Sequence, residues 1–271
     1  MANKICRVVL LVLLIISCQT VQQTGRSQFI VASESQELQL GDQAYQETLK
    51  KNRISTRNDW DTQLRRVGQR IAAAADKPDY KWEFTLIQGK EVNAFALPGG
   101  KVVFWEGMIP VAQDNNGVAV VMGHEVAHAL ARHGAERMTQ TMGAQAIGEL
   151  LALGVGKVSP GLQEDFLKVY GLGTTVGILL PWGRTQESEA DRIGVTLMAK
   201  AAYDPASAIG FWERMSKIGG DKPPEFLSTH PSDQTRVAQV KEWLPEARSY
   251  YRGEIKLFGP GRGNWRDWRN F

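Results

Sequence analysis

The chain has 271 residues, of which 43% are hydrophobic and 23% are charged, and its formal net charge is +3. This composition is typical of a globular protein and excludes collagen-like and wholly disordered classes. The small net charge argues against nucleic acid as the main partner. The two cysteines, Cys6 and Cys18, both lie near the N-terminus, which excludes a disulfide framework and a four-cysteine zinc site.

The N-terminal residues have the pattern of a secretion signal. Lys4 and Arg7 are followed by an apolar run at 8–16, which is shorter than the roughly 20 residues that cross a bilayer. Residues 15–18, Ile-Ile-Ser-Cys, resemble the lipobox of bacterial lipoproteins, in which cleavage precedes a lipidated cysteine. We therefore expect residues 1–17 to be a lipoprotein signal peptide and Cys18 to carry a lipid anchor. An ordinary secretory signal with an incidental cysteine is the alternative.

The expected destination is the bacterial cell envelope. Gln19 follows the cysteine where an inner-membrane lipoprotein would have Asp, and this points to the periplasmic face of the outer membrane. Residues 19–28 are mostly small and polar, a composition typical of a flexible tether, and we expect the lipidated cysteine and this tether to occupy residues 18–34.

The remaining chain predicts helices, then short strands, then helices again. Apolar periodicity predicts helices from about residue 35 and over 58–74. Partial alternation predicts three strands, the last two joined by a Pro-Gly-Gly turn, at 80–87, 93–97 and 102–105. The chain after residue 115 is predicted to be mainly helical.

We expect one α+β domain over residues 35–245, mainly helical with a small β-sheet, followed by a C-terminal tail over 246–271. Two glycine-containing apolar stretches, 144–155 and 170–181, are too short to span a membrane. They are interpreted as helices or loops over the functional cleft.

A histidine pair on an apolar helix predicts a metal site. His124 and His128 are four residues apart, so both imidazoles lie on one helix face and can bind one tetrahedral Zn²⁺. Glu125 follows the first histidine, about 100° around the helix axis, which is the place of a general base beside the open metal position. Two buried histidines that only hydrogen-bond are the alternative.

A catalytic zinc site needs a third protein ligand, and an acidic helix supplies the best candidate. Glu187 and Asp191 share one helix face, whereas Glu189 points elsewhere. With Glu187 as ligand, Asp191 can accept a hydrogen bond from a ligand histidine. A solvated acidic helix start is the alternative, and His133 is interpreted as a helix C-terminal residue.

Four motifs together resemble the metallopeptidase family of HtpX and the CAAX prenyl proteases. They are Asn-Ala-Phe-Ala-Leu-Pro-Gly-Gly at 93–100, His-Glu-Val-Ala-His at 124–128, Glu-Ser-Glu-Ala-Asp at 187–191 and Thr-His-Pro-Ser at 229–232. The likeness runs from about residue 37 to 236. Within the family, the soluble periplasmic lipoprotein branch of LoiP and BepA is the most similar, and the fold it implies is a gluzincin-type zincin domain with an edge strand along the active-site cleft.

The resemblance implies a zinc endopeptidase that holds one Zn²⁺ per chain with His124, His128 and Glu187. Glu125 is then the general base. In the family the late histidine, here His230, approaches the metal as a fourth ligand or acts near the oxyanion.

Further roles are expected around this centre. His230 or Arg236 is a candidate second donor to the oxyanion. An extended peptide or unfolded protein substrate is expected to add to the edge strand through main-chain hydrogen bonds, at Asn93, Ala94, Phe95 and Ala96.

Two functions are compatible with these motifs. The first is a metalloendopeptidase that hydrolyses misfolded or misassembled envelope proteins. The second is a non-proteolytic or latent chaperone or assembly factor whose zinc site is closed by His230. The first is favoured because Glu125 has no role in a purely structural zinc site.

Overall fold

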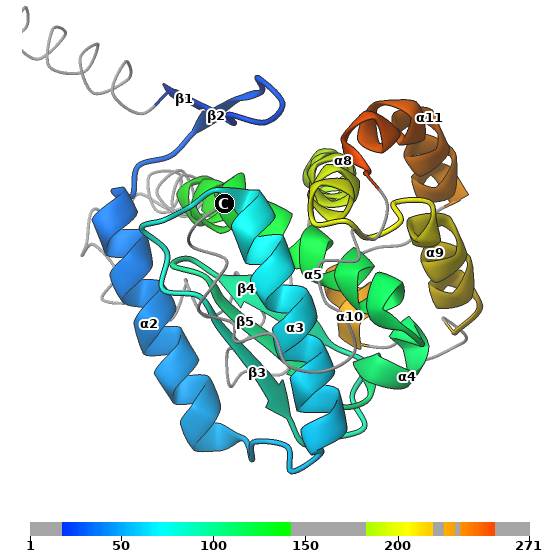
Figure 1. Ribbon diagram of the computed structural model, residues 1–271. Coiled ribbons are helices and arrows are strands. Elements are labelled where there is room, and N and C mark those ends of the chain that lie inside the picture. The colour runs from blue at the N-terminus through cyan, green and yellow to red at the C-terminus, as the bar shows by residue number, and fades with distance from the viewer. Residues whose placement is uncertain (1–17, 142–182, 219–224, 231–233, 253–271) are drawn as a thin grey trace, which may run out of the picture.

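The computed structural model describes residues 18–141, 183–218, 225–230 and 234–252. The expected signal peptide at 1–17 and the stretches 144–155 and 170–181 lie outside the described residues. The described part is an α+β domain, mainly helical with a small sheet, as the sequence predicted (Figure 1).

The elements follow the order expected from the sequence, with one hairpin added at the start. Their bounds are β1 (Cys18–Thr20), β2 (Ser27–Phe29), α2 (Glu34–Lys51), α3 (Asn58–Ala75), β3 (Glu83–Ile87), β4 (Ala94–Leu97), β5 (Lys101–Trp105), α4 (Met108–Ala112), α5 (Asn115–Leu130), α8 (Arg184–Lys200), α9 (Ser207–Ile218), α10 (Glu225–Thr229) and α11 (Gln234–Tyr250). Residues 133–141 are also helical.

The central sheet has three strands in the order β3–β5–β4. β5 is parallel to β3 and antiparallel to β4, so β4 is an edge strand of the described sheet. Gly99 and Gly100, between β4 and β5, both have φ of 85°, a left-handed backbone that favours glycine.

The sheet is covered by helices on both faces. One face, formed by Phe84, Ala96, Val102 and Phe104 among others, packs with α3 and α5 in the larger core. The opposite face packs on α2, where the hydroxyls of Tyr45 and Thr85 lie 2.5 Å apart. Because alternate side chains point to opposite faces, these short strands are buried on both sides.

Helix α5 lies at the centre of the domain, and every residue from 117 to 130 is buried. Asp114 caps it, since its carboxylate accepts a hydrogen bond from the N–H of Gly117 at 2.8 Å. A helix surrounded by protein is apolar all round, and α5 packs against α3, α8, α9 and β4. His124, Glu125 and His128 therefore lie in the interior of the domain.

Two glycines bring α5 and α8 into backbone contact. A Cβ atom added to Gly123 would lie 2.9 Å from the carbonyl oxygen of Gly194, and one added to Gly194 would lie 3.0 Å from the nitrogen of His124. The first distance is shorter than real Cβ atoms show, and the second is tighter than nine in ten real Cβ contacts. This close approach sets the acidic start of α8 opposite the two histidines of α5.

The flexible tether expected over residues 18–34 is replaced by an ordered hairpin. β1 and β2 pair antiparallel, and Val21, Gln28 and Ile30 are buried. At the other end, α11 continues to Tyr250, beyond the expected domain end at 245, because Leu244 and Ala247 face the core.

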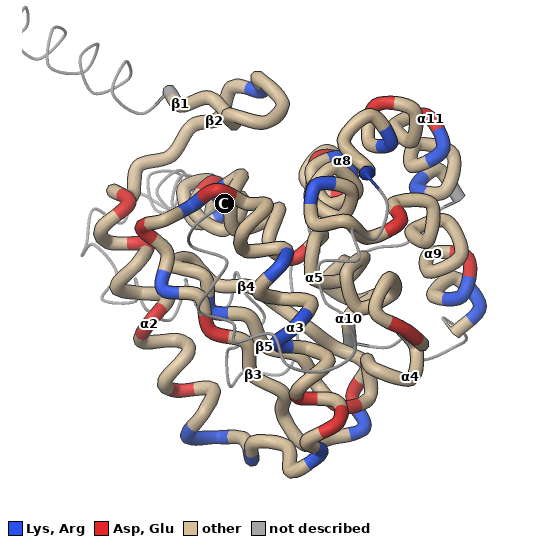
Figure 2. The backbone as a smooth tube through the Cα atoms, viewed as in Figure 1, with Lys and Arg blue, Asp and Glu red and all other residues tan. Residues whose placement is uncertain are grey.

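Acidic and basic residues are interspersed over the outer helices rather than separated by sign (Figure 2). Among the described residues, no helix combines the length and the apolar character needed to cross a membrane.

Candidate metal centre

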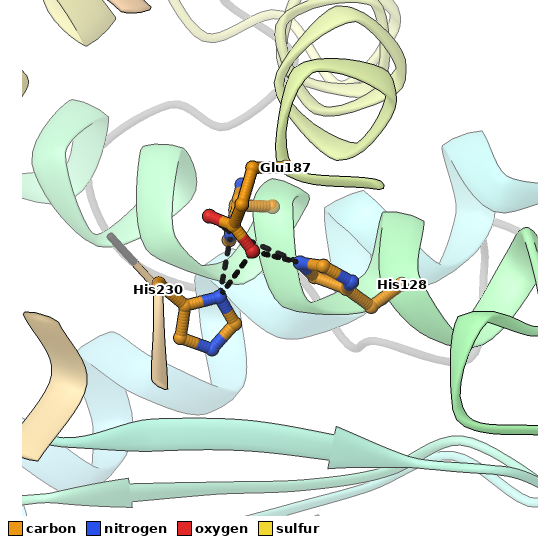
Figure 3. Close-up of side chains that lie close together, drawn as sticks. His128, Glu187 and His230 are labelled. Carbon is orange, nitrogen blue, oxygen red and sulfur yellow. Dashed lines mark hydrogen bonds and ion pairs between the residues drawn. The ribbon is translucent and has the colours of Figure 1, made fainter. Parts of the chain in front are cut away.

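Four buried side chains from three parts of the fold meet at one point. His124 and His128 come from α5, Glu187 from the first turn of α8, and His230 from the end of α10, and one ligand atom of each lies within 4.8 Å of the others. Figure 3 shows Glu187 between His128 and His230, with contacts to both.

The spacing of these atoms fits a tetrahedral metal ion. His124 Nε2 lies 3.1 Å from both His128 Nε2 and His230 Nδ1. The Glu187 carboxylate oxygens lie 3.0 Å from His230 Nδ1, 3.3 Å from His128 Nε2 and 3.5 Å from His124 Nε2. Ligands at the zinc bond lengths of about 2.0–2.1 Å are about 3.3–3.4 Å apart around a tetrahedron. Nitrogen and carboxylate donors at this spacing suit zinc, and His230 stands where a fourth ligand would be.

The ionisation of this cluster also suits a cation. Burial disfavours protonation of His124, but Glu187 and Asp191 outweigh it and raise its pKa to about 9. Burial lowers the pKa of His128 well below its usual range. Burial opposes the charge of Glu187, yet His230 and Arg236 hold its pKa well below the usual value. His128 and Glu187 are therefore in the forms that bind metals, a neutral imidazole and an ionised carboxylate, whereas His124 gives up its proton when a metal binds.

Among the described residues, Glu125 is the carboxylate beside the cluster that has an oxygen without a hydrogen bond. Its Oε1 is buried, accepts no hydrogen bond from any described residue and lies 3.5 Å from His230 Nε2. Burial raises the pKa of Glu125, against the opposing charges of His230 and His124. A buried, unsatisfied carboxylate is costly, and such groups are typical of reaction centres.

Asp191 and Arg236 hold the metal-facing residues from behind. His124 Nδ1 lies 2.9 Å from Asp191 Oδ1, and Arg236 donates from Nε and Nη2 to Asp191, both at 2.7 Å. Arg236 Nη1 donates to Glu187 Oε2 at 2.9 Å, and its guanidinium lies 3.5 Å from the Trp212 ring centroid. Arg236 therefore orients two carboxylates, a different place from the oxyanion donor considered from the sequence.

His230 is positioned by aromatic packing at the end of α10. Its ring stacks on Phe226, with centroids 4.6 Å apart and planes at 25°. The N–H of Phe226 in turn donates to Val92 O at 3.2 Å, which joins α10 to the entry of β4. The late histidine and the edge strand are thus fixed relative to one another.

Sequence reasoning missed a second polar set behind His128. The chain leaves α5 at Ala131, and Arg132 takes a left-handed φ of 56°, so His133 turns back toward the site. His133 Nδ1 lies 2.9 Å from His128 Nδ1, and His133 Nε2 lies 2.8 Å from Glu189 Oε2. The interpretation of His133 as a helix C-terminal residue is therefore wrong, since an uninterrupted helix was assumed.

Strand β4 presents its backbone at the sheet edge. The N–H of Trp105 donates to Asn93 O at 3.0 Å, so Asn93 and Phe95 are the residues that bond β5. By the alternation of an antiparallel ladder, Ala94 and Ala96 direct their main-chain groups away from β5, and both residues are buried. The N–H of Ala94 already donates to Asn93 Oδ1 at 2.9 Å.

A central helix that carries two histidines and a carboxylate, completed by a glutamate from a second helix, defines the metallopeptidase class. Comparison with known families agrees, because the model of peptidase family M48 matches residues 58–244. The chain belongs to peptidase family M48, which is the family of HtpX and the CAAX prenyl proteases that the motifs predicted.

Named relatives come from mitochondria and bacteria. "Mitochondrial metalloendopeptidase OMA1" of Schizosaccharomyces pombe is 42% identical over 185 residues, which are 68% of this chain and 52% of that protein. The Saccharomyces cerevisiae protein of the same name is 31% identical and covers 84% of this chain and 69% of its own length. "Beta-barrel assembly-enhancing protease" of Escherichia coli is 29% identical, with 86% of this chain and 48% of that protein covered. This chain therefore spans about half the length of two of these relatives.

Proposed function

We propose that this protein is a zinc-dependent metalloendopeptidase in which His124, His128 and Glu187 hold one Zn²⁺ and Glu125 is the general base. The observation that carries the proposal is the convergence of three ligand atoms beside a buried carboxylate oxygen with no described hydrogen-bond donor. When bound, zinc polarises the scissile carbonyl and lowers the pKa of water from about 15.7 toward about 7.

The protein's own groups supply the proton transfers and the orientation. Glu125 Oε1 takes the proton of the attacking water and delivers it to the leaving amine. The pKa of Glu125 is raised. A general base works best when its pKa lies near the working pH, so the shift favours this role. Asp191 and Arg236 keep His124 and Glu187 aimed at the same point.

We propose that an extended peptide pairs with the edge of β4. Ala96 directs its N–H and its C=O away from β5, and Ala94 directs its C=O there while its N–H donates to Asn93 Oδ1. Such pairing gives affinity through the main chain without demanding one sequence, as expected for unfolded protein substrates.

The test compares Glu125→Gln with Glu187→Ala and the wild-type protein. Glu125→Gln is expected to retain about one zinc per chain and to lose peptide hydrolysis by about 10²–10⁴-fold, the usual share of a general base. Glu187→Ala is expected to lose the metal and the activity together. Wild-type hydrolysis by Glu125→Gln, or hydrolysis that survives removal of zinc by a chelator, would refute the proposal.

A second candidate is a latent or non-proteolytic protein with a closed site. The observation that favours it is the position of His230 Nδ1, 3.1 Å from His124 Nε2 and 3.0 Å from Glu187 Oε1. Structural zinc sites have four protein ligands, whereas catalytic sites keep one position open. In the latent form, His230 leaves the metal before substrate is cleaved.

We further propose that the protein acts in the bacterial cell envelope on misfolded or misassembled proteins, as a lipoprotein of the outer membrane. The signal pattern at 1–17, the lipobox that ends at Cys18 and the residue Gln19 support this location. The name of the Escherichia coli relative supports an envelope role, although the mitochondrial relatives place the family more widely.

A further inference from the structure

A continuous set of contacts, buried at His128 and His133 and part-buried at the hairpin, joins His128 to the N-terminal hairpin. His128 Nδ1 contacts His133, and His133 contacts Glu189 on α8. Glu189 then accepts hydrogen bonds from Arg26 Nε at 2.7 Å and from the hydroxyl of Thr24. Thr24 and Arg26 lie in the loop between β1 and β2. Their partner Glu189 is more than 100 residues further along the chain.

The chemistry of the set fixes where its protons lie. His128 Nε2 faces the proposed metal position, so the proton of the neutral ring is on Nδ1. This Nδ1–H donates to His133 Nδ1. His133 is then neutral and donates from Nε2 to Glu189.

Arg26 anchors this set by bridging two buried carboxylates. Its Nη1 and Nη2 donate to the two oxygens of Glu136 at 2.7 and 2.9 Å, while its Nε donates to Glu189 Oε2. Gln186, next to the proposed ligand Glu187, also donates to Glu136 at 2.8 Å. Both carboxylates are only 7% exposed, so loss of the guanidinium leaves two buried charges without their principal cation.

The arrangement parallels the one behind the other histidine of α5. There, His124 is held by a carboxylate that a buried arginine clamps, in the order His124, Asp191, Arg236. Behind His128 the order is His133, Glu189, Arg26. The second set differs in three respects. His133 stands between His128 and the carboxylate, the arginine comes from the hairpin and not from the helical core, and Arg26 is partly exposed whereas Arg236 is buried.

We propose that His133, Glu189 and Arg26 are positioning residues for His128. Hairpin β1–β2, which carries Arg26, therefore helps to orient a ligand of the zinc centre. The inference rests on the proposed zinc site. It predicts that changes in the hairpin alter metal binding although no hairpin residue is a metal ligand.

The test measures zinc affinity by competition with a chromogenic chelator, and the visible absorption of the Co²⁺-substituted protein. Loss of an outer partner of a metal-bound histidine usually costs about 10–100-fold in affinity. We expect a loss of this size for Arg26→Ala and Glu189→Ala, with a changed Co²⁺ spectrum. Arg26→Lys keeps the charge but cannot bridge both carboxylates, so its affinity is expected to fall between Arg26→Ala and the wild type.

The matched control is Arg65→Ala, which removes an arginine from an exposed pair with Asp61 at 2.7 Å on α3. It is expected to keep the wild-type affinity and spectrum. Should Arg26→Ala not fold, Arg26→Lys and Glu189→Gln carry the same comparison. Wild-type zinc affinity and an unchanged Co²⁺ spectrum in the folded hairpin variants would overturn the positioning role and leave the zinc site intact. A wild-type protein that binds no zinc would overturn both.

Discussion

At the scale of single residues, the site is a set of polar groups held inside an apolar helix. His124, Glu125 and His128 are each at most 2% exposed, and buried polar groups need partners. Helical spacing was sufficient to predict that the two histidines share one helix face, whereas spacing alone favoured Glu187 only modestly and the family resemblance implied it as the third ligand. The link from His133 to Glu189 was not predictable, because it depends on the left-handed turn at Arg132.

The position of His230 gives a prediction at this scale. Replacing it in His230→Ala opens the fourth ligand position and removes the ring that lies 3.5 Å from the base Glu125. We expect a several-fold rise in the rate of casein hydrolysis, with three ligands still retaining zinc. Initial rates and metal content are measured on the same preparation.

The double variant Glu125→Gln/His230→Ala is the control and is expected to be inactive. A fall in hydrolysis by His230→Ala at full zinc content would contradict latency and assign His230 a direct role in the reaction.

At the scale of elements, the site depends on how closely α5 and α8 approach. The sequence predicted both helices from the spacing of their polar residues, four residues apart in each, and the three strands close to their observed bounds. It did not predict that β5 lies between β3 and β4, because strand order depends on long-range pairing. The hairpin β1–β2 was also missed, since its small and polar residues have the composition of a tether and its stabilising contacts come from Glu136 and Glu189 far along the chain.

The glycine contact between these helices gives a prediction. Gly194→Ala places a methyl group about 3.0 Å from the backbone of His124, which must separate α5 from α8. Overpacking of this kind costs about 1–3 kcal/mol in the free energy of unfolding. We expect that loss in urea unfolding, together with weaker zinc retention, because Glu187 lies on the helix that moves.

Gly210→Ala on α9 is the matched control. Its added methyl group would meet nothing closer than 3.5 Å, at a side-chain atom of Arg214. Alanine in place of glycine in a helix is expected to stabilise by up to about 1 kcal/mol and to leave zinc binding unchanged. If Gly194→Ala and Gly210→Ala had the same free energy of unfolding and the same zinc retention, the contact between α5 and α8 would not position the site.

At the scale of the whole molecule, the chain joins a metallopeptidase domain to an expected membrane anchor through a short hairpin. Composition and motifs were sufficient to predict one α+β domain and its family. The spatial relation between hairpin and site was beyond sequence reasoning, because nothing local marks Arg26 as the partner of residues on α8.

The proposed anchor gives a prediction at this scale. Cys18→Ala in the full-length chain removes the lipidated thiol, so the protein is expected to lose incorporation of labelled palmitate and to leave the membrane fraction. Zinc content and hydrolysis by the released protein should stay at the wild-type level, since the residues proposed to hold the metal lie far along the chain, on α5, on α8 and after α10. Unchanged labelling and membrane association would contradict lipidation at Cys18.

The most direct test of the central claim is the location of zinc by anomalous diffraction from crystals, recorded above and below the zinc absorption edge. The account predicts one peak per chain, about 2.0–2.2 Å from Nε2 of His124, Nε2 of His128 and a carboxylate oxygen of Glu187. A peak away from these three side chains, or fully zinc-loaded protein in which Glu187 is not a ligand, would contradict it.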